Sequence, residues 1–237
     1  MKLVMFDVDG TLTQTDYADE VCFVQALRDV FGFTSLNTDW ASYTHCSDSG
    51  ILEELFQQRL GRSPLATEIS SFQSYFLSLL AAATAAQPFR PVAGARDFVW
   101  NLMSNSQLAV SLASGAWECS ARFKLTSAGL DFHQIPAAFS DSAYAREDIM
   151  RASLTKAARS RSRDSFDSVI YVGDGVWDAR AARNLGCGFI GISREPARIE
   201  RLYAEGASHV FHDYLDADSF IAILHDFQPC RLTKRCS

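Results

Sequence analysis

Short apolar runs recur along the chain, and stretches of helical character separate them. The runs that we predict to be strands are Leu3–Asp9, Leu108–Ser114, Ser168–Gly173, Gly188–Ser193 and His209–Phe211, with a further short strand at Ala137–Phe139. Strands that alternate with helices in this way are typical of a parallel sheet with helices on both faces. We therefore predict an α/β protein.

The segment between Thr15 and Pro88 breaks this alternation, because it contains no good strand and three blocks of helical periodicity. The apolar positions of the three blocks are Phe23, Val24, Leu27, Val30 and Phe31, then Ile51, Leu52, Leu55 and Phe56, then Ile69, Phe72, Phe76, Leu79, Leu80 and Ala83. We predict a small helical domain at 15–88 and an α/β core formed by 1–14 and 89–237. The helical domain is expected over the carboxyl edge of the sheet, where open α/β sheets bind ligands.

Two carboxylates end the first predicted strand. Asp7 and Asp9 are two residues apart on an extended chain, so both side chains face the same side. Gly10 and Thr11 come next. A plain Asp-Gly turn would explain Asp9 and Gly10, but it leaves Asp7 unexplained.

A second acidic pair, Asp174 and Asp178, follows the strand that ends at Gly173. These two acids could simply cap a helix and complement its dipole. However, four acids at the ends of parallel strands would repel one another and raise one another's pKa. A hard divalent cation removes this conflict, and an all-oxygen ligand set favours Mg²⁺. Asp7, Asp9, Asp174 and Asp178 are therefore candidate metal ligands.

Two further features could bind an anion. Ser114 and Gly115 end a strand before a helix, where free N–H groups and a hydroxyl can hold a phosphoryl oxygen, although Ser114 could also be an ordinary helix cap. Arg146 stands at a helix start beside Glu147 and Asp148. The helix dipole disfavours a cation there unless the cation reaches an anion.

Charge and composition narrow the class of partner. A formal net charge of -6 argues against nucleic acid and anionic membranes, and no apolar run reaches the roughly 18–20 residues that span a bilayer. Removal of a secretory signal would remove Asp7, so we expect a cytoplasmic protein. The six cysteines have no C-x-x-C spacing, so a zinc site or disulfide framework is not expected; Cys230 and Cys236, in a basic tail, are the only notable pair. The sequence does not indicate an oligomeric state.

The motifs Asp7–Leu12, Ser114 and Gly173–Asp178 resemble those of the haloacid dehalogenase-like superfamily of phosphatases and phosphotransferases. The resemblance covers essentially the whole chain and implies a three-layer Rossmann-like parallel sheet core with a small all-helical cap domain. It departs at the third motif, which ordinarily supplies a Lys. We assign that role to Arg146 in preference to Lys156, which lies roughly 15 Å further along the same helix.

The resemblance also implies the roles of these residues in a Mg²⁺-dependent phosphatase. Asp7 is the nucleophile that becomes phosphorylated, and Asp9 is the general acid and base. The Mg²⁺ ligands are Asp7, the Asp9 backbone carbonyl and Asp174, with Asp178 acting through water or as an orienting group. Ser114, Gly115 and Arg146 bind the phosphoryl group.

Other activities of the superfamily fit less well. Dehalogenases need neither a metal nor a second acid such as Asp9. The phosphonatase-like branch uses a cap lysine, and 15–88 contains no Lys. A phosphomutase keeps the same acids and remains open, as does a non-catalytic phosphometabolite-binding protein, which intact Asp7 and Asp9 disfavour.

The substrate is expected to be a small phosphorylated molecule. The candidate contacts are Thr44, His45 and Asp48, in a polar loop between two helices of the predicted cap. An ordinary loop in which Asp48 or Ser49 caps the following helix explains the same residues equally well.

Overall fold

The computed structural model describes residues 1–228 of the 237, and in this part the chain forms a six-stranded parallel sheet. The strands are β1 (Lys2–Phe6), β2 (Leu108–Ala113), β3 (Ala137–Ala138), β4 (Val169–Gly173), β5 (Gly188–Ile192) and β6 (His209–Phe211). Their order is β3-β2-β1-β4-β5-β6, the order of a Rossmann-like sheet. The α/β prediction is confirmed, and each predicted strand is present.

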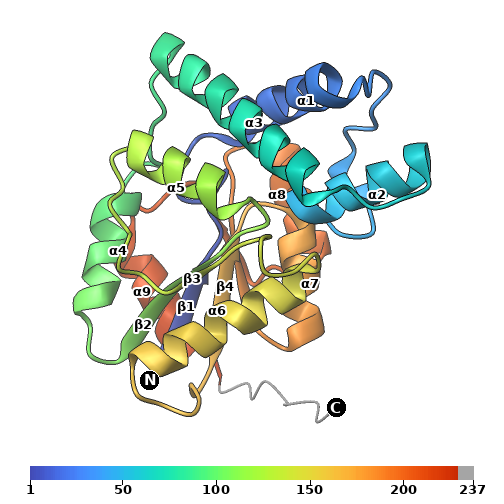
Figure 1. Cartoon of the computed structure of the whole chain (residues 1–237). Helices are drawn as coiled ribbons and strands as arrows, with labels where there is room; N and C mark the ends of the chain where they lie inside the picture. Colours follow the sequence, from blue (N-terminus) through green and yellow to red (C-terminus); the bar gives the residue numbers. More distant parts are fainter. Residues whose placement is uncertain (229–237) are drawn as a thin grey trace.

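Helices cover both faces of the sheet, which makes the three layers visible in Figure 1. The helices of the core are α4 (Ala95–Ser104), α5 (Glu118–Ser127), α6 (Arg146–Ser160), α7 (Val176–Leu185), α8 (Pro196–Ala204) and α9 (Ala217–Asp226). Successive side chains of β1 pack on opposite faces of the sheet. Val4 and Phe6 join a cluster with residues of α4 and α9, and Leu3 and Met5 join one with residues of α6 and α7.

Residues 15–88 form the three helices predicted from periodicity. These are α1 (Asp16–Phe31), α2 (Asp48–Leu60) and α3 (Ala66–Ala86), with a short 3₁₀ helix at Trp40–Ser42. They lie together beyond the carboxyl ends of the strands, on the side of the molecule opposite the N-terminus (Figure 1). Aromatic rings fill the space between them; Phe23 meets Phe72 and Phe76 edge to face.

The packing of these helices does not stop at residue 88. Trp117 and Ala128, at the two ends of α5, are buried in the same apolar cluster as Phe23 and Phe72. Helix α5 therefore contributes to the core and to the layer above it. We call residues 15–88 the cap, and its separation as a domain of its own stays a prediction.

Within the described residues, α3 is long and apolar enough to cross a membrane by length and composition alone. Such a helix is also what the core of a globular protein can contain. Here Phe72, Phe76 and Leu80 of α3 are buried against the rest of the cap. One helix of this kind is weak evidence for a membrane, and the structure uses its apolar side for packing.

Four of the six cysteines lie in residues 1–228, and no disulfide joins any two of these four. Cys230 and Cys236 lie outside the described residues.

Candidate active site

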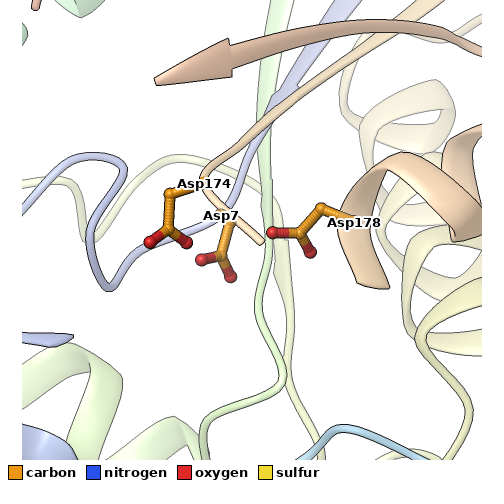
Figure 2. Close-up of side chains that lie close together, drawn as sticks. All are labelled: Asp7, Asp174 and Asp178. Atoms are coloured by element: carbon orange, nitrogen blue, oxygen red, sulfur yellow. The ribbon is translucent and has the colours of Figure 1, made fainter. Parts of the chain in front are cut away.

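Three carboxylates meet at the carboxyl ends of β1 and β4, the two central strands. Asp7 follows β1, Asp174 follows β4, and Asp178 lies in the first turn of α7. Each side chain offers an oxygen within 4.8 Å of the others, and Figure 2 shows the carboxylates turned toward one another. All three are buried. Strand order thus brings together acids that are about 170 residues apart in the sequence.

The strand β1 is shorter than predicted, because it ends at Phe6 and not at Asp9. Asp7 still donates its N–H to the Val172 carbonyl of β4 at 3.0 Å. The chain then turns at Gly10, whose φ of 67° is left-handed. A Cβ at Gly10 would lie 2.2 Å from Asp174 Oδ2, so glycine is needed both for the turn and for the approach of Asp174.

The buried acids carry more negative charge than their surroundings neutralise. Burial raises the pKa of Asp7 to about 7; the charge of Asp178 adds to this, and Arg146 opposes it. Burial also raises the pKa of Asp174 well above its ordinary value, against the effect of Arg198. Burial likewise raises the pKa of Asp178, with Arg146 opposing. Three close, buried carboxyl groups with raised pKa values fit a divalent metal ion, whose charge would stabilise their ionised forms.

Arg146, the first residue of α6, is the cation beside this cluster. Its Nη1 donates to Asp7 Oδ1 at 3.1 Å, and its Nε lies 3.4 Å from Asp178 Oδ1. It is buried, as expected of a residue that contacts these acids. Lys156, on the same helix, is exposed and donates to the Ala137 carbonyl at 2.7 Å. Arg146 is thus beside Asp7, and Lys156 is not.

Gly115 makes room for this arginine. A Cβ at Gly115 would lie 2.7 Å from Arg146 Nη2. Ser114, immediately before it, is buried, and its Oγ accepts the N–H of Ala116 at 3.3 Å. Ser114 also forms a hydrogen bond that lowers the pKa of Asp7. Ser114 is therefore not the cap of α5, whose N-cap is Trp117; it accepts a hydrogen bond in the turn before that helix and lies beside Asp7, and its phosphoryl-binding role stays a prediction.

The Asp9 side chain points away from the three clustered carboxylates. Its Oδ1 accepts a hydrogen bond from Thr15 Oγ1 at 2.6 Å, and its Oδ2 accepts one from Lys124 Nζ at 2.6 Å. The carboxylate is thus held toward the cap. Both side-chain oxygens of Asp9 thus have partners within the protein, and metal binding by its backbone carbonyl stays a prediction.

A cleft of about 390 Å³ lies between the cap and the core at this point. Its lining includes Asp7, Asp9, Ser114, Gly115, Arg146 and Asp174. Asp48, one of the predicted substrate contacts, also lines it. Thr44 and His45 are not among its lining residues, whereas their neighbours Cys46 and Ser47 are.

Asp48 also connects the start of α2 to the core through two hydrogen bonds. Its N–H donates to the Gly115 carbonyl at 2.8 Å, and its Oδ2 accepts the N–H of Trp117 at 2.9 Å. Burial raises the pKa of Asp48 well above its ordinary value. The loop also caps this helix, but through Ser47 and not through Asp48 or Ser49 as the alternative predicted, since Ser47 Oγ accepts the N–H of Gly50 at 3.2 Å and α2 begins at Asp48.

Two cations at the site were not predicted from the sequence. Lys124 of α5 contacts Asp9 and Asp19, and Arg198 of α8 contacts Asp174 at 2.5 Å and Asp16 at 3.2 Å. Each cation therefore joins one acid of the core to one acid of α1. A sequence signal existed for Lys124, because it lies three residues after buried Ala121 and next to buried Leu125, on an apolar helix face.

The fold and the acidic site define a class: a parallel α/β protein with its nucleophile candidate at the end of the first strand and further acids at the end of a neighbouring strand. The family model of the haloacid dehalogenase-like hydrolases matches residues 1–186. The chain belongs to this family, as the resemblance of its motifs indicated.

Solved structures share the fold at low sequence identity. A hydrolase from Pseudomonas syringae has 20% identity and a TM-score of 0.72, with 94% of this chain and 99% of that one covered. CbbY from Rhodobacter sphaeroides, in complex with phosphate, has 17% identity and a TM-score of 0.63 (90% and 95% covered). A predicted phosphoglycolate phosphatase from Haemophilus somnus 129PT has 16% identity and a TM-score of 0.62 (93% and 98% covered). The comparison with curated proteins gives no match.

Proposed function

We propose that the protein is a Mg²⁺-dependent phosphatase that hydrolyses a small phosphorylated metabolite through a phosphorylated Asp7. The observation that carries this proposal is the meeting of Asp7, Asp174 and Asp178 with Arg146 beside one cleft, which Asp7, Asp174 and Arg146 line. Acids of this kind suit a metal and a nucleophile, and the arginine suits a phosphoryl group.

In the first half of the reaction, an Asp7 carboxylate oxygen attacks phosphorus in line. The bond between phosphorus and the ester oxygen breaks, and Asp9 gives its proton to the leaving oxygen. In the second half, Asp9 takes a proton from a water molecule, whose oxygen attacks phosphorus. The bond to Asp7 breaks, and inorganic phosphate is released.

The metal would be held by the carboxylates of Asp7 and Asp174 and by the Asp9 carbonyl, with Asp178 acting through water. When bound, it would neutralise the buried acids and the charge of the phosphoryl group. Arg146 would bind the phosphoryl oxygens with its planar guanidinium, and Ser114 and the N–H of Gly115 would complete the cradle. These contacts orient the phosphorus and stabilise its charge, which is the main task in phosphoryl transfer.

The charges of the cleft favour a monophosphate as substrate. Its cap side is lined by the acids Asp16, Asp19, Glu20, Asp39 and Asp48, and among the described lining residues every arginine belongs to the core: Arg146, Arg198 and Arg201. A phosphomutase has to hold a bisphosphate, and the cap side of this cleft would repel a second phosphate. We therefore favour hydrolysis over the phosphomutase alternative.

Turnover of an aryl phosphate by the purified protein tests this function. We expect hydrolysis with Mg²⁺, none after removal of divalent ions by a chelator, and no rescue by Ca²⁺, which prefers more ligands at longer distances. The Asp174→Asn variant should lose the response to Mg²⁺. Asp148→Asn is the matched control, since Asp148 is exposed and pairs with Arg151 on the surface.

Full activity without any divalent ion would contradict the metal assignment and reopen the dehalogenase hypothesis.

A panel of phosphorylated metabolites then tests the substrate class. We expect monophosphates to be hydrolysed in preference to bisphosphates, and release of inorganic phosphate to distinguish hydrolysis from a mutase reaction. We also propose that the partner of the protein is its small-molecule substrate.

A further inference from the structure

Lys124 is the most deeply buried cation of the described chain that the proposed reaction does not use. Its side chain has 0% exposure, and it lies on α5 beside the apolar residues Ala121 and Leu125. An ammonium group in such a place costs several kcal/mol unless acids compensate it. Apolar packing therefore does not explain a lysine at this position, and its charge and the groups that it contacts have to.

Two carboxylates compensate the charge of Lys124. Its Nζ donates to Asp9 Oδ2 at 2.6 Å and to Asp19 Oδ1. Burial by itself would lower the pKa of Lys124, but Asp19 and Asp9 outweigh burial and raise it above the ordinary value. Lys124 is therefore a fixed ammonium group. It cannot serve as the neutral amine that a Schiff-base reaction requires.

The two acids belong to different parts of the molecule. Asp9 follows β1 in the core, whereas Asp19 lies in the first turn of the cap helix α1. The other oxygen of Asp9 accepts a hydrogen bond from Thr15, the residue before α1. Both contacts of the Asp9 carboxylate therefore lead, directly or through Lys124, to the start of α1.

Resting on the proposed function, we propose that Lys124 is a positioning residue that fixes the Asp9 carboxylate and makes its position depend on helix α1. Thr15 is neutral, so its contact with Asp9 is weaker than the ion pair with Lys124. When Asp9 is protonated on Oδ1, the ester oxygen can replace Thr15 as the partner of Oδ1 and take that proton, while Lys124 keeps Oδ2 in place. If α1 moves away, Lys124 loses Asp19 and Asp9 loses Thr15. The acid–base residue is then aligned only while α1 is seated.

Amide hydrogen exchange tests the link to α1 without any substrate. We expect Lys124→Met to speed exchange in residues 16–31, because Asp19 of α1 is left without its cationic partner in the core. Asp19→Asn, which keeps the shape of the side chain, should have the same effect in a milder form. Lys156→Met is the control, since this exposed lysine lies on α6 away from the cap. Unchanged exchange in 16–31 for both test variants overturns the proposed link.

The dependence of kcat on the leaving group tests whether Lys124 positions Asp9 for proton transfer. An acidic phenol leaves phosphorus with little need of a proton, whereas an alcohol needs one. We expect Lys124→Met to lower kcat for both substrates, with a loss for an alkyl phosphate that is at least about ten times the loss for a p-nitrophenyl ester. General acid catalysis contributes about 10²–10⁴-fold, and only the alkyl ester depends on it strongly. KM should change little.

Equal losses of kcat for both leaving groups would show a merely structural role and would overturn the proposal. The double variant Lys124→Met/Asp19→Asn should lose no more activity than Lys124→Met alone, since the two residues act through one contact. If the wild type hydrolyses no phosphate ester, the proposed function fails. The exchange experiment still decides whether Lys124 holds α1.

Discussion

Asp7 and Asp174 are costly at the scale of the residue, because burial and like charge both disfavour their ionised forms. Asp7 is the clearest case, since its pKa is raised from 3.8 to about 7. In the unfolded chain the same carboxyl group loses its proton near pH 4. Between these two values the folded state holds a proton that the unfolded state has released. Without a metal, the Asp7 contribution to stability is therefore lost as the pH rises through this window.

This argument predicts the pH dependence of the metal-free protein. With chelator present, the free energy of unfolding of the wild type should fall from about pH 4 to about pH 7 more steeply than that of Asp7→Asn. The amide keeps the shape of the side chain but cannot ionise, so the variant should be the more stable of the two at pH 8. Urea unfolding at a series of pH values measures the effect.

Asp148→Asn is the control for this experiment, because Asp148 is exposed and belongs to the surface of α6. Its profile should follow that of the wild type. Parallel profiles for the wild type and Asp7→Asn would mean that Asp7 does not carry the proton that we assign to it. The Asp7→Asn variant should also have no measurable turnover of a phosphate ester, because it lacks the proposed nucleophile.

The positions of single site residues were predictable where the local sequence is unusual, and their chemical roles stay predictions. Asp7 and Asp174 stand at the ends of apolar strands, and no packing or turn rule accounts for Asp7. Arg198 gave no such signal, because a surface helix with several arginines is ordinary. Its contact with Asp174 depends on how α8 packs against β6 and α7, and no local pattern encodes that.

At the scale of the element, the apolar runs predicted the strands, and the ends of the strands were less accurate. The predicted first strand continued to Asp9, but the backbone leaves the ladder after Phe6 to make the turn at Gly10. Asp7 and Asp9 consequently do not share one face of a strand. Asp7 joins the acids of β4 and α7, and Asp9 is held by Thr15 and Lys124.

Helix α6 supplies a prediction at this scale, since both candidates for the third motif lie on it. Arg146→Ala should lower kcat with an aryl phosphate at saturating Mg²⁺ at least about a hundredfold, because it removes a charged partner of the phosphoryl group. Lys156→Ala should stay close to the wild type. Steady-state kinetics of the two variants, with circular dichroism to confirm folding, makes the comparison.

The opposite ranking would overturn the assignment of Arg146. Arg146→Lys refines the test, since it keeps the charge and loses the planar fork. We expect it to recover only part of the lost activity, because one ammonium cannot replace contacts to Asp7 and Asp178 made by different atoms of the guanidinium.

At the scale of the whole molecule, the site is completed by the way the cap rests on the core. The order of the motifs predicted which strand ends carry the acids, and the helical periodicity predicted the three cap helices. The docking of these helices was not predictable, because it depends on single contacts between distant residues. Asp48 with Gly115 and Asp19 with Lys124 are two of these. This is why the polar loop was located correctly while Asp48, and not Thr44 or His45, lines the cleft.

The central claim is that Asp7 carries the phosphoryl group between the two halves of the reaction. The Asp9→Asn variant isolates that state. With a p-nitrophenyl ester the first half needs little acid catalysis, whereas the second half loses the base that activates water. The phosphorylated protein should therefore accumulate.

Acid quenching of Asp9→Asn during turnover, followed by mass spectrometry of its peptides, tests this claim most directly. We predict one added phosphoryl group, located on Asp7 and absent from the double variant Asp7→Asn/Asp9→Asn. A phosphoryl group on another residue would contradict the account. So would the absence of any phosphorylated protein, in burst-phase and steady-state samples alike, while the wild type hydrolyses the same ester.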